Sequence, residues 1–220
     1  MILDRLIEID QAATLYLNSF HTPLTDSFWI VLSDVRVWFP AYGFILLMMF
    51  LRLGWRKALI VLLSCIATVI LADQISYHVK YAVERLRPCY TAAMIENGIH
   101  LPLPRKGLYG FFSGHSSNVF SFIACSLVGF RNDGEHSYNA YMWWGFVWAA
   151  LVALSRVMTA MHFVGDILVG MVFGLVLGYL TGYTTRFIIL KWVEKEPIEW
   201  KSFWHSALKR RKHLFHPDSA

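Results

Sequence analysis

The sequence predicts an all-α protein, a polytopic helix bundle embedded in a membrane, and three observations favour this fold class. Of the 220 residues, 56% are hydrophobic and 16% are charged, and the mean hydropathy is +0.46. Soluble domains are about 45–50% apolar and about 25% charged. The chain also has nine Trp, a residue that gathers at bilayer interfaces. This composition argues against a disordered chain or an ordinary soluble domain.

A membrane-spanning helix needs about 20 apolar residues, so the chain can hold one bundle of five or six such helices. The apolar runs predict five spans, at about 27–52, 57–79, 114–130, 140–157 and 162–190. Residues 1–20 favour an amphipathic helix at the membrane surface, because Asp4, Glu8 and Gln11 form a polar stripe. A sixth span over the same residues is the alternative.

Two of these runs have unusual residues. Asp34 and Arg36 interrupt the first half of the first run. The last run has a glycine at every fourth or fifth position, and small residues at that spacing let helices approach closely. These glycines are Gly165, Gly170, Gly174, Gly178 and Gly182.

We expect residues 1–190 to form the membrane domain and residues 191–220 to form a cytoplasmic tail. The tail has a basic cluster at 209–212 and an apolar helical face that includes Trp200 and Trp204. It therefore predicts a helix lying on the anionic inner leaflet, with a solvated, disordered tail as the alternative. The three cysteines form no CxxC motif and are expected to be small apolar fillers.

The spans divide the loops between two ends of the bundle. Face A comprises the N-terminus, the 80–113 loop and the 157–162 turn, and face B comprises the 52–57 turn, the 131–139 loop and the tail. Face B has eleven Lys and Arg against eight on face A when Arg36 is included. The positive-inside rule then places face B in the cytoplasm and face A on the outside. The net charge of +5 therefore needs no nucleic acid to explain it.

The first of three polar clusters on face A follows the second span. Lys80 and Arg87 are seven residues apart, so both cations can lie on one helix face and form an anion clamp before Pro88 ends the helix. Arg85 points elsewhere and is expected to lie on the surface. The alternative is that Lys80 and Arg87 simply extend to the membrane interface.

The second cluster begins the third span. Ser113 is a good helix cap, and the free backbone N–H groups that follow it form a site for anions. Gly114 lets a ligand approach closely, and His115 can donate a proton near neutral pH. The alternative is an ordinary cap with a histidine at the interface.

The third cluster lies between the last two spans, where Arg156 closes one helix and His162 opens the next. His162 and Asp166 are four residues apart on the predicted helix, so the carboxylate can accept a hydrogen bond from one imidazole nitrogen. The other nitrogen would then be a base or a nucleophile. A structural His–Asp pair is the alternative.

All three clusters fall on face A and together offer three cations, a helix N-terminus and two histidines. That set suits a tetrahedral oxyanion such as phosphate. We expect no metal and no cofactor, because the site has no cluster of carboxylates.

The three clusters are similar to the motifs of the type 2 phosphatidic acid phosphatase superfamily. The matching residues are Lys80 with Arg87-Pro88, then Phe112-Ser113-Gly114-His115, then Ser155-Arg156 with His162 and Asp166. Every spacing agrees, and Phe112 stands where the family usually has Pro. This departure predicts a changed loop path, with activity retained. The resemblance covers residues 80–190 in detail.

The resemblance implies a role for each residue. His162 would attack phosphorus and form a phosphohistidine, Asp166 would raise its basicity, and His115 would protonate the leaving oxygen. The phosphate oxygens would be held by the remaining residues, namely Lys80, Arg87, Ser113, Gly114 and Arg156.

The function expected from this resemblance is hydrolysis of a lipid phosphate at the periplasmic face of a bacterial inner membrane. The leading substrates are a lipid A phosphate and then undecaprenyl diphosphate, followed by phosphatidylglycerophosphate and phosphatidic acid. A lipid phosphotransferase with an alcohol acceptor is the alternative. A channel, transporter or scaffold is disfavoured, because the polar residues cluster at one end of the helices.

Overall fold

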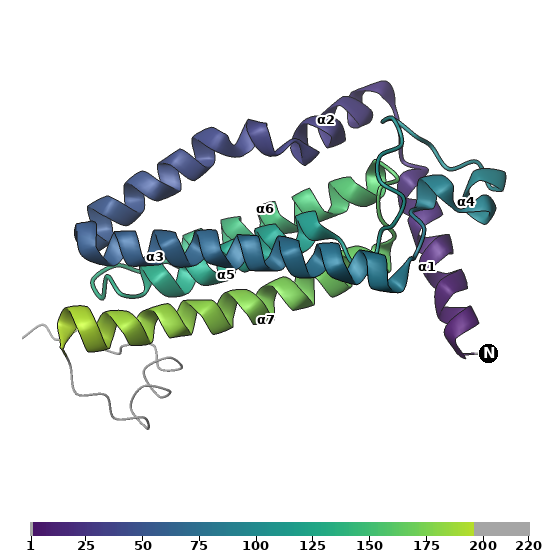
Figure 1. The fold of residues 1–220 in the computed structure, drawn as a ribbon. Coiled ribbons are helices and arrows are strands. Elements are labelled where there is room, and N and C mark those ends of the chain that lie inside the picture. Colours follow the sequence, from purple (N-terminus) through teal and green to yellow (C-terminus); the bar gives the residue numbers. More distant parts are fainter. Residues whose placement is uncertain (1, 196–220) are drawn as a thin grey trace, which may run out of the picture.

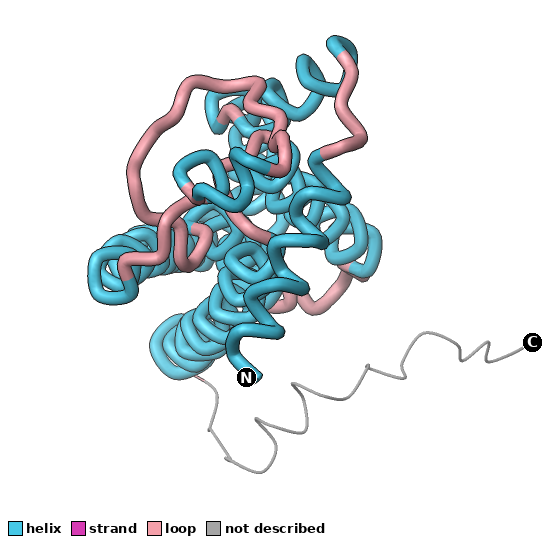
Figure 2. Tube along the Cα trace, turned by 90° about the vertical axis from the view of Figure 1, so that its right-hand side faces the viewer, coloured by secondary structure: helices cyan, strands magenta, loops and turns pink. Residues whose placement is uncertain are grey.

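A computed structural model, which describes residues 2–195, is built of helices, and no strand is assigned in that range. The long helices lie side by side, and α1, α4 and the loops around them gather at one end (Figures 1 and 2). The all-α membrane bundle predicted from the sequence is therefore confirmed. The helices are α1 (Ile2–Asn18), α2 (Pro23–Ser33), α3 (Phe39–Val83), α4 (Ala92–Glu96), α5 (Gly114–Phe130), α6 (Asn139–Met158) and α7 (Val164–Ile188).

Helix α3 comprises two antiparallel halves joined at Gly54. A straight helix of its 45 residues would be about 70 Å long, more than twice the apolar thickness of a bilayer. Gly54 has φ 71° and ψ 163°, a conformation suited to glycine, and the chain reverses direction there (Figure 1). The predicted turn at residues 52–57 is therefore confirmed.

The predicted first span, 27–52, is wrong in its first half. Helix α2 ends at Ser33, a 3-10 helix follows at Val35–Trp38, and α3 starts at Phe39. Asp34 breaks the helix because its side chain accepts a hydrogen bond from the backbone N–H of Arg36 and pairs with the Arg36 guanidinium. Pro40 then stands in the first turn of α3, where its missing N–H costs no hydrogen bond.

Helix α5 lies at the centre of the bundle, and fourteen of its seventeen residues are buried. The glycines of α7 pack against it. A Cβ added at Gly170 would lie 2.7 Å from the carbonyl oxygen of Ser113, and one at Gly174 would lie 2.5 Å from that of Ser117. The backbones of α5 and α7 can approach this closely only with glycine at these positions, as the sequence spacing predicted.

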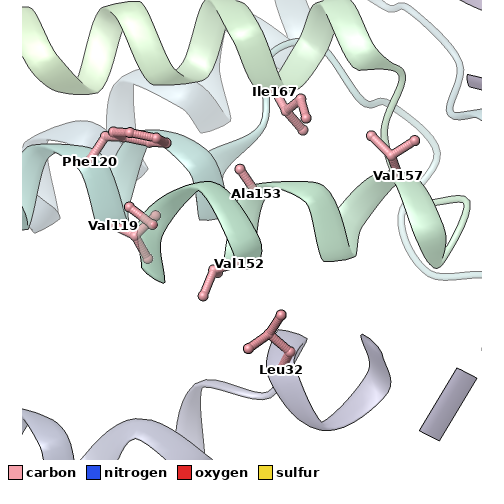
Figure 3. Packing of buried hydrophobic residues seen from close by; sticks show 8 residues of the cluster. Leu32, Val119, Phe120, Val152, Ala153, Val157 and Ile167 are labelled. Carbon is pink, nitrogen blue, oxygen red and sulfur yellow. The ribbon is translucent and has the colours of Figure 1, made fainter. Parts of the chain in front are cut away.

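The side chains of one hydrophobic cluster join four helices near the face A end of the bundle (Figure 3). Leu32 of α2 faces Val152 of α6, and Ile167 of α7 completes the cluster on the opposite side of α6. This packing holds α2 against α6.

Helix α1 runs across the end of the bundle, as Figures 1 and 2 show. Its C-terminal half is held by Asn18, which donates hydrogen bonds to the carbonyl oxygens of Met158 (3.0 Å) and His100 (3.1 Å). Its N-terminal half exposes Ile2 and Leu3. That placement supports a helix at the membrane surface, which stays a prediction.

Three helical segments among the described residues are long and apolar enough to cross a membrane, namely Val35–Val83, Asn139–Met158 and Val164–Glu194. The last of these ends in a π-helix, Ile189–Glu194, where Glu194 forms an ion pair with Lys57. The predicted tail helix lies, from residue 196 on, outside the described residues. The predicted division at residue 190 stays a prediction.

Candidate active site

A cavity of about 480 Å³ opens at the face A end of the bundle and brings most of the predicted site together. Six of the eight predicted residues line it: Lys80, Arg87, Gly114, His115, Arg156 and His162. The other two, Ser113 and Asp166, are fully buried and do not line the cavity. Residues that are far apart in the sequence therefore meet around one space that can hold a phosphate group.

The α5 N-terminus forms one side of this cavity. Ser113 caps the helix as predicted, and its hydroxyl accepts a hydrogen bond from the backbone N–H of Ser116. A Cβ added at Gly114 would lie 3.0 Å from Ser76 Oγ and 3.4 Å from Lys80 Nζ. The Lys80 ammonium therefore lies beside the helix N-terminus, where both favour an anion.

Arg87 is held in place by the loop that precedes α5. Its Nε donates to the carbonyl oxygen of Tyr109 (3.1 Å), and its backbone N–H donates to that of Leu108 (3.1 Å). Burial lowers the pKa of the Arg87 guanidinium from its ordinary value, but a guanidinium keeps its charge at neutral pH. Arg87 is thus a fixed cation at the cavity wall.

The turn between α6 and α7 places His162 beside Arg156. The backbone N–H groups of Met161 and His162 both donate to the carbonyl oxygen of Arg156, at 2.9 and 3.1 Å. His162 therefore precedes α7, which begins at Val164, and the prediction that it opens that helix is wrong. The imidazole is 2% exposed, and burial lowers its pKa to about 4, so it is neutral at pH 7.

Asp166 lies next to His162 as the sequence spacing predicted, but the contact is long. Nδ1 of His162 is 3.5 Å from Oδ2 of Asp166 and has no hydrogen-bond partner among the described residues. The same Oδ2 accepts from the backbone N–H of Phe163 (3.0 Å). Nδ1 of His162 therefore faces the Asp166 carboxylate, and Nε2 is the ring nitrogen that remains free to react.

Arg85, which the sequence predicted to lie on the surface, is a second partner of Asp166. Its Nη1 donates to Asp166 Oδ1 (2.7 Å) and its Nη2 donates to Asp10 Oδ2 of α1 (2.6 Å). The surface prediction is therefore wrong, because the chain that follows α3 turns Arg85 under the loop and onto Phe163. Asp10 was not predicted as a site residue. The one feature of the sequence that could have indicated it is its position on α1, away from the polar stripe of that helix.

The rest of the cavity wall is mostly apolar and is built by α2, α3, α5 and α6. Its side chains include Leu32, Trp38, Tyr42, Phe122 and Trp148. Polar side chains also stand among them, including Asp73 and Asn118. Asn118 Nδ2 lies 3.4 Å from Asp73 Oδ1, while Asn118 Oδ1 is buried with no hydrogen-bond partner among the described residues. The cavity can thus take a phosphate at one end and an apolar chain along its wall.

Comparison with known protein families identifies the family of this chain. The model of the PAP2 superfamily matches residues 57–189, which span all three motifs. The chain belongs to the PAP2 superfamily. The resemblance noted from Lys80 to Asp166 is therefore confirmed, and the protein is a membrane lipid phosphatase of this superfamily.

Individual relatives agree with this assignment. A lipid A 4'-phosphatase of Porphyromonas gingivalis is 28% identical over 169 residues, which are 76% of this chain and 69% of that protein. Two crystal structures share the fold. A transmembrane PAP2-type phosphatidylglycerolphosphate phosphatase from Bacillus subtilis superposes with a TM-score of 0.65, at 22% identity over 84% of this chain and 88% of that one. LpxE of Aquifex aeolicus superposes with a TM-score of 0.54, at 21% identity over 77% of this chain and 92% of that one.

Proposed function

We propose that this phosphatase hydrolyses a lipid phosphate through a phosphohistidine on His162. The observation that carries the binding of a phosphate in this cavity is the state of Arg156. Its Nε is buried and has no hydrogen-bond partner among the described residues, although its side chain lines the cavity. A buried donor without a partner is costly, and a bound phosphate oxygen would satisfy it.

The first step is an attack by Nε2 of His162 on phosphorus, which breaks the bond between phosphorus and the lipid oxygen. His115 lines the same cavity; the negative charge of the bound phosphate favours its protonated form, which donates a proton to that leaving oxygen. Asp166 stabilises the positive charge that develops on the imidazole. Lys80, Arg87 and Arg156 stabilise the charge on the phosphoryl oxygens, together with the backbone N–H of Gly114.

In the second step water attacks the phosphohistidine. His115, now neutral, accepts the proton from the water, the bond between phosphorus and nitrogen breaks, and inorganic phosphate leaves. Ser113 caps α5 and so fixes the N–H groups that face the phosphate; a direct contact of its hydroxyl with phosphate stays a prediction. The proposed steps use no metal, so activity should persist in EDTA.

The lipid phosphate enters from the periplasmic side in this proposal. The excess of Lys and Arg on face B favours a cytoplasmic tail, and the cavity lies at the opposite end of the bundle. Fusion of reporter domains to the C-terminus tests this. A reporter active only in the cytoplasm should work there, and a reporter active only in the periplasm should not.

Among substrates we propose a lipid A phosphate first and undecaprenyl diphosphate next. The relative from Porphyromonas gingivalis supports this order through its name, lipid A 4'-phosphatase. Asp73 and Asn118 also support it, because these acceptors in an apolar wall suit a head group with hydrogen-bond donors beside the phosphate. The amide and hydroxyl groups of lipid A offer such donors, whereas undecaprenyl diphosphate has no such group.

Phosphate release from purified protein tests the proposal. The panel comprises lipid A, undecaprenyl diphosphate, phosphatidylglycerophosphate and phosphatidic acid, each with and without EDTA. Separating the lipid products distinguishes hydrolysis from transfer, since a phosphotransferase would place the phosphate on a second lipid. Retained activity after His162→Ala substitution would reject the phosphohistidine.

A further inference from the structure

The N-terminal helix α1 reaches the candidate active site through a single carboxylate. Asp10 Oδ2 accepts from Arg85 Nη2 at 2.6 Å, and Asp10 Oδ1 accepts from the backbone N–H of Gly165 at 2.7 Å. The carboxylate therefore binds the guanidinium and the first turn of α7 at the same time. Gly165 permits this approach, because an added Cβ would lie 2.9 Å from Asp10 Oδ2.

The guanidinium of Arg85 connects this carboxylate to Asp166. Nη1 donates to Asp166 Oδ1 at 2.7 Å, and the guanidinium carbon lies 4.2 Å from the centre of the Phe163 ring. Asp166 is fully buried, whereas Arg85 and Asp10 keep side-chain exposures of 24% and 15%. A charge-assisted pair with one buried partner has a well-defined geometry.

Two further contacts of α1 hold the same turn. Thr14 Oγ1 accepts from the backbone N–H of Val164 (3.1 Å), and Asn18 donates to the carbonyl oxygen of Met158. Helix α1 therefore contacts both sides of the turn that carries His162. All of these α1 residues lie before residue 57, where the match to the family model begins.

We propose that Asp10 is a positioning residue for the phosphatase reaction, acting through Arg85 to hold Asp166 against His162. The proposal rests on the function proposed above, in which His162 is the nucleophile. Arg85 is fixed at two points, because each carboxylate accepts a hydrogen bond from a different Nη atom of its guanidinium. Asp10 also fixes Gly165, and thus the start of the helix that carries Asp166.

The test compares Asp10→Asn with Glu8→Gln, a matched control that removes the same charge from an exposed position of α1. We expect Asp10→Asn to lower kcat about 10- to 100-fold. This is the range found in metalloproteins when a residue that hydrogen-bonds to a metal-ligating histidine is removed. KM should change less than threefold, since Lys80, Arg87 and Arg156 are untouched. Glu8→Gln should match the wild type. An Asp10→Asn variant within twofold of the control would overturn the proposal.

Chemical rescue separates positioning from a loss of folded protein. Arg85→Ala should lose most activity, and added methylguanidinium should restore part of it by occupying the space between the two carboxylates. In the double variant Asp10→Asn/Arg85→Ala, half-maximal rescue should need a several-fold higher methylguanidinium concentration. Equal rescue in both backgrounds would overturn the role of Asp10.

Thermal unfolding of each variant supplies a second check that holds even if Arg85→Ala does not fold. If the loss of kcat in Asp10→Asn equals the loss of folded protein, Asp10 is only structural and the proposal fails. Failure of the proposed function gives a different result, because His162→Ala would then keep its activity. If His162→Ala loses its activity while Asp10→Asn keeps the kcat of the wild type, only the positioning role of Asp10 is rejected.

Discussion

Nδ1 of His162 lies 3.5 Å from Oδ2 of Asp166, while both Asp166 oxygens accept shorter hydrogen bonds from other groups. Asp166 is thus held by Arg85 and by the backbone N–H of Phe163 before any substrate binds. In the proposed mechanism, the imidazole approaches this fixed carboxylate as positive charge develops on the ring. Enzymes commonly tighten such contacts only in the substrate complex.

The pKa of His162 predicts how the enzyme responds to acid. Burial lowers this pKa from 6.5 to about 4, and only the neutral imidazole can attack phosphorus. His162 therefore stays reactive as the pH falls from 7 to 5, and its protonation should reduce kcat/KM only nearer pH 4. A pH profile, corrected for the second ionisation of the substrate phosphate near about pH 6, measures this. Loss of activity on acidification with a midpoint near 6.5, once the substrate ionisation is corrected for, would contradict the assignment.

Arg156→Ala should remove one donor from the phosphoryl oxygens. We expect kcat/KM to fall about 100-fold or more, as for the loss of one oxyanion donor. Arg156→Lys should restore only part of the activity, because Lys cannot present the two donors of a guanidinium fork. Arg131→Ala, at an exposed position beyond the far end of α5, serves as the control. Steady-state kinetics with a short-chain lipid phosphate checks all three, and an unchanged Arg156→Ala would place the phosphate elsewhere.

Asp73→Asn should change the choice of substrate more than the rate. Its carboxylate lines the cavity and can accept a hydrogen bond from the head group of lipid A, so its loss should reduce kcat/KM for lipid A about tenfold, as expected for one hydrogen bond to a charged group. Undecaprenyl diphosphate, which has no donor beside its phosphates, should be hydrolysed as before or faster. Competition between the two lipids measures the ratio. An equal loss for both lipids would mean that Asp73 does not select between them.

Gly174→Ala should destabilise the bundle. The added Cβ would lie 2.5 Å from the carbonyl oxygen of Ser117, and forced overpacking of this kind costs about 1–3 kcal/mol. Gly43→Ala is the matched control, because nothing lies within 4 Å of a Cβ added there. Thermal unfolding in detergent should show a lower midpoint for Gly174→Ala alone. Equal midpoints would show that α5 and α7 can separate at no cost.

The sequence predicted the long helices and the three motifs well, because each depends on residues that are close together in the chain. Apolar runs located α5, α6 and α7 to within two residues at most of their ends, and Gly54 with its basic neighbours marked the turn in α3. Six of the eight predicted site residues line one cavity, because their spacings placed them at helix ends on one face. The helix break after Ser33 was not predicted. It lies inside an apolar run, where the Asp34 side chain ends α2 by accepting a hydrogen bond from the backbone N–H of Arg36.

The sequence could not predict contacts between distant segments. Arg85 was read as a surface cation because helical spacing put it away from Lys80, yet the fold brings it to Asp166, 81 positions later. Asp10 likewise lies 75 positions before Arg85. No periodicity links these three residues, so only the packing of α1 across the bundle end shows that they form one network.

The most direct test is phosphate release from lipid A by the purified protein and its His162→Ala variant, combined with trapping of the phosphoenzyme. We expect the wild type to release phosphate with EDTA present and to give an acid-labile, base-stable phosphoryl label on His162. His162→Ala should give neither the label nor phosphate above background, while remaining folded in thermal unfolding. Phosphate release by a folded His162→Ala variant, or a label on another residue, would contradict the phosphohistidine mechanism.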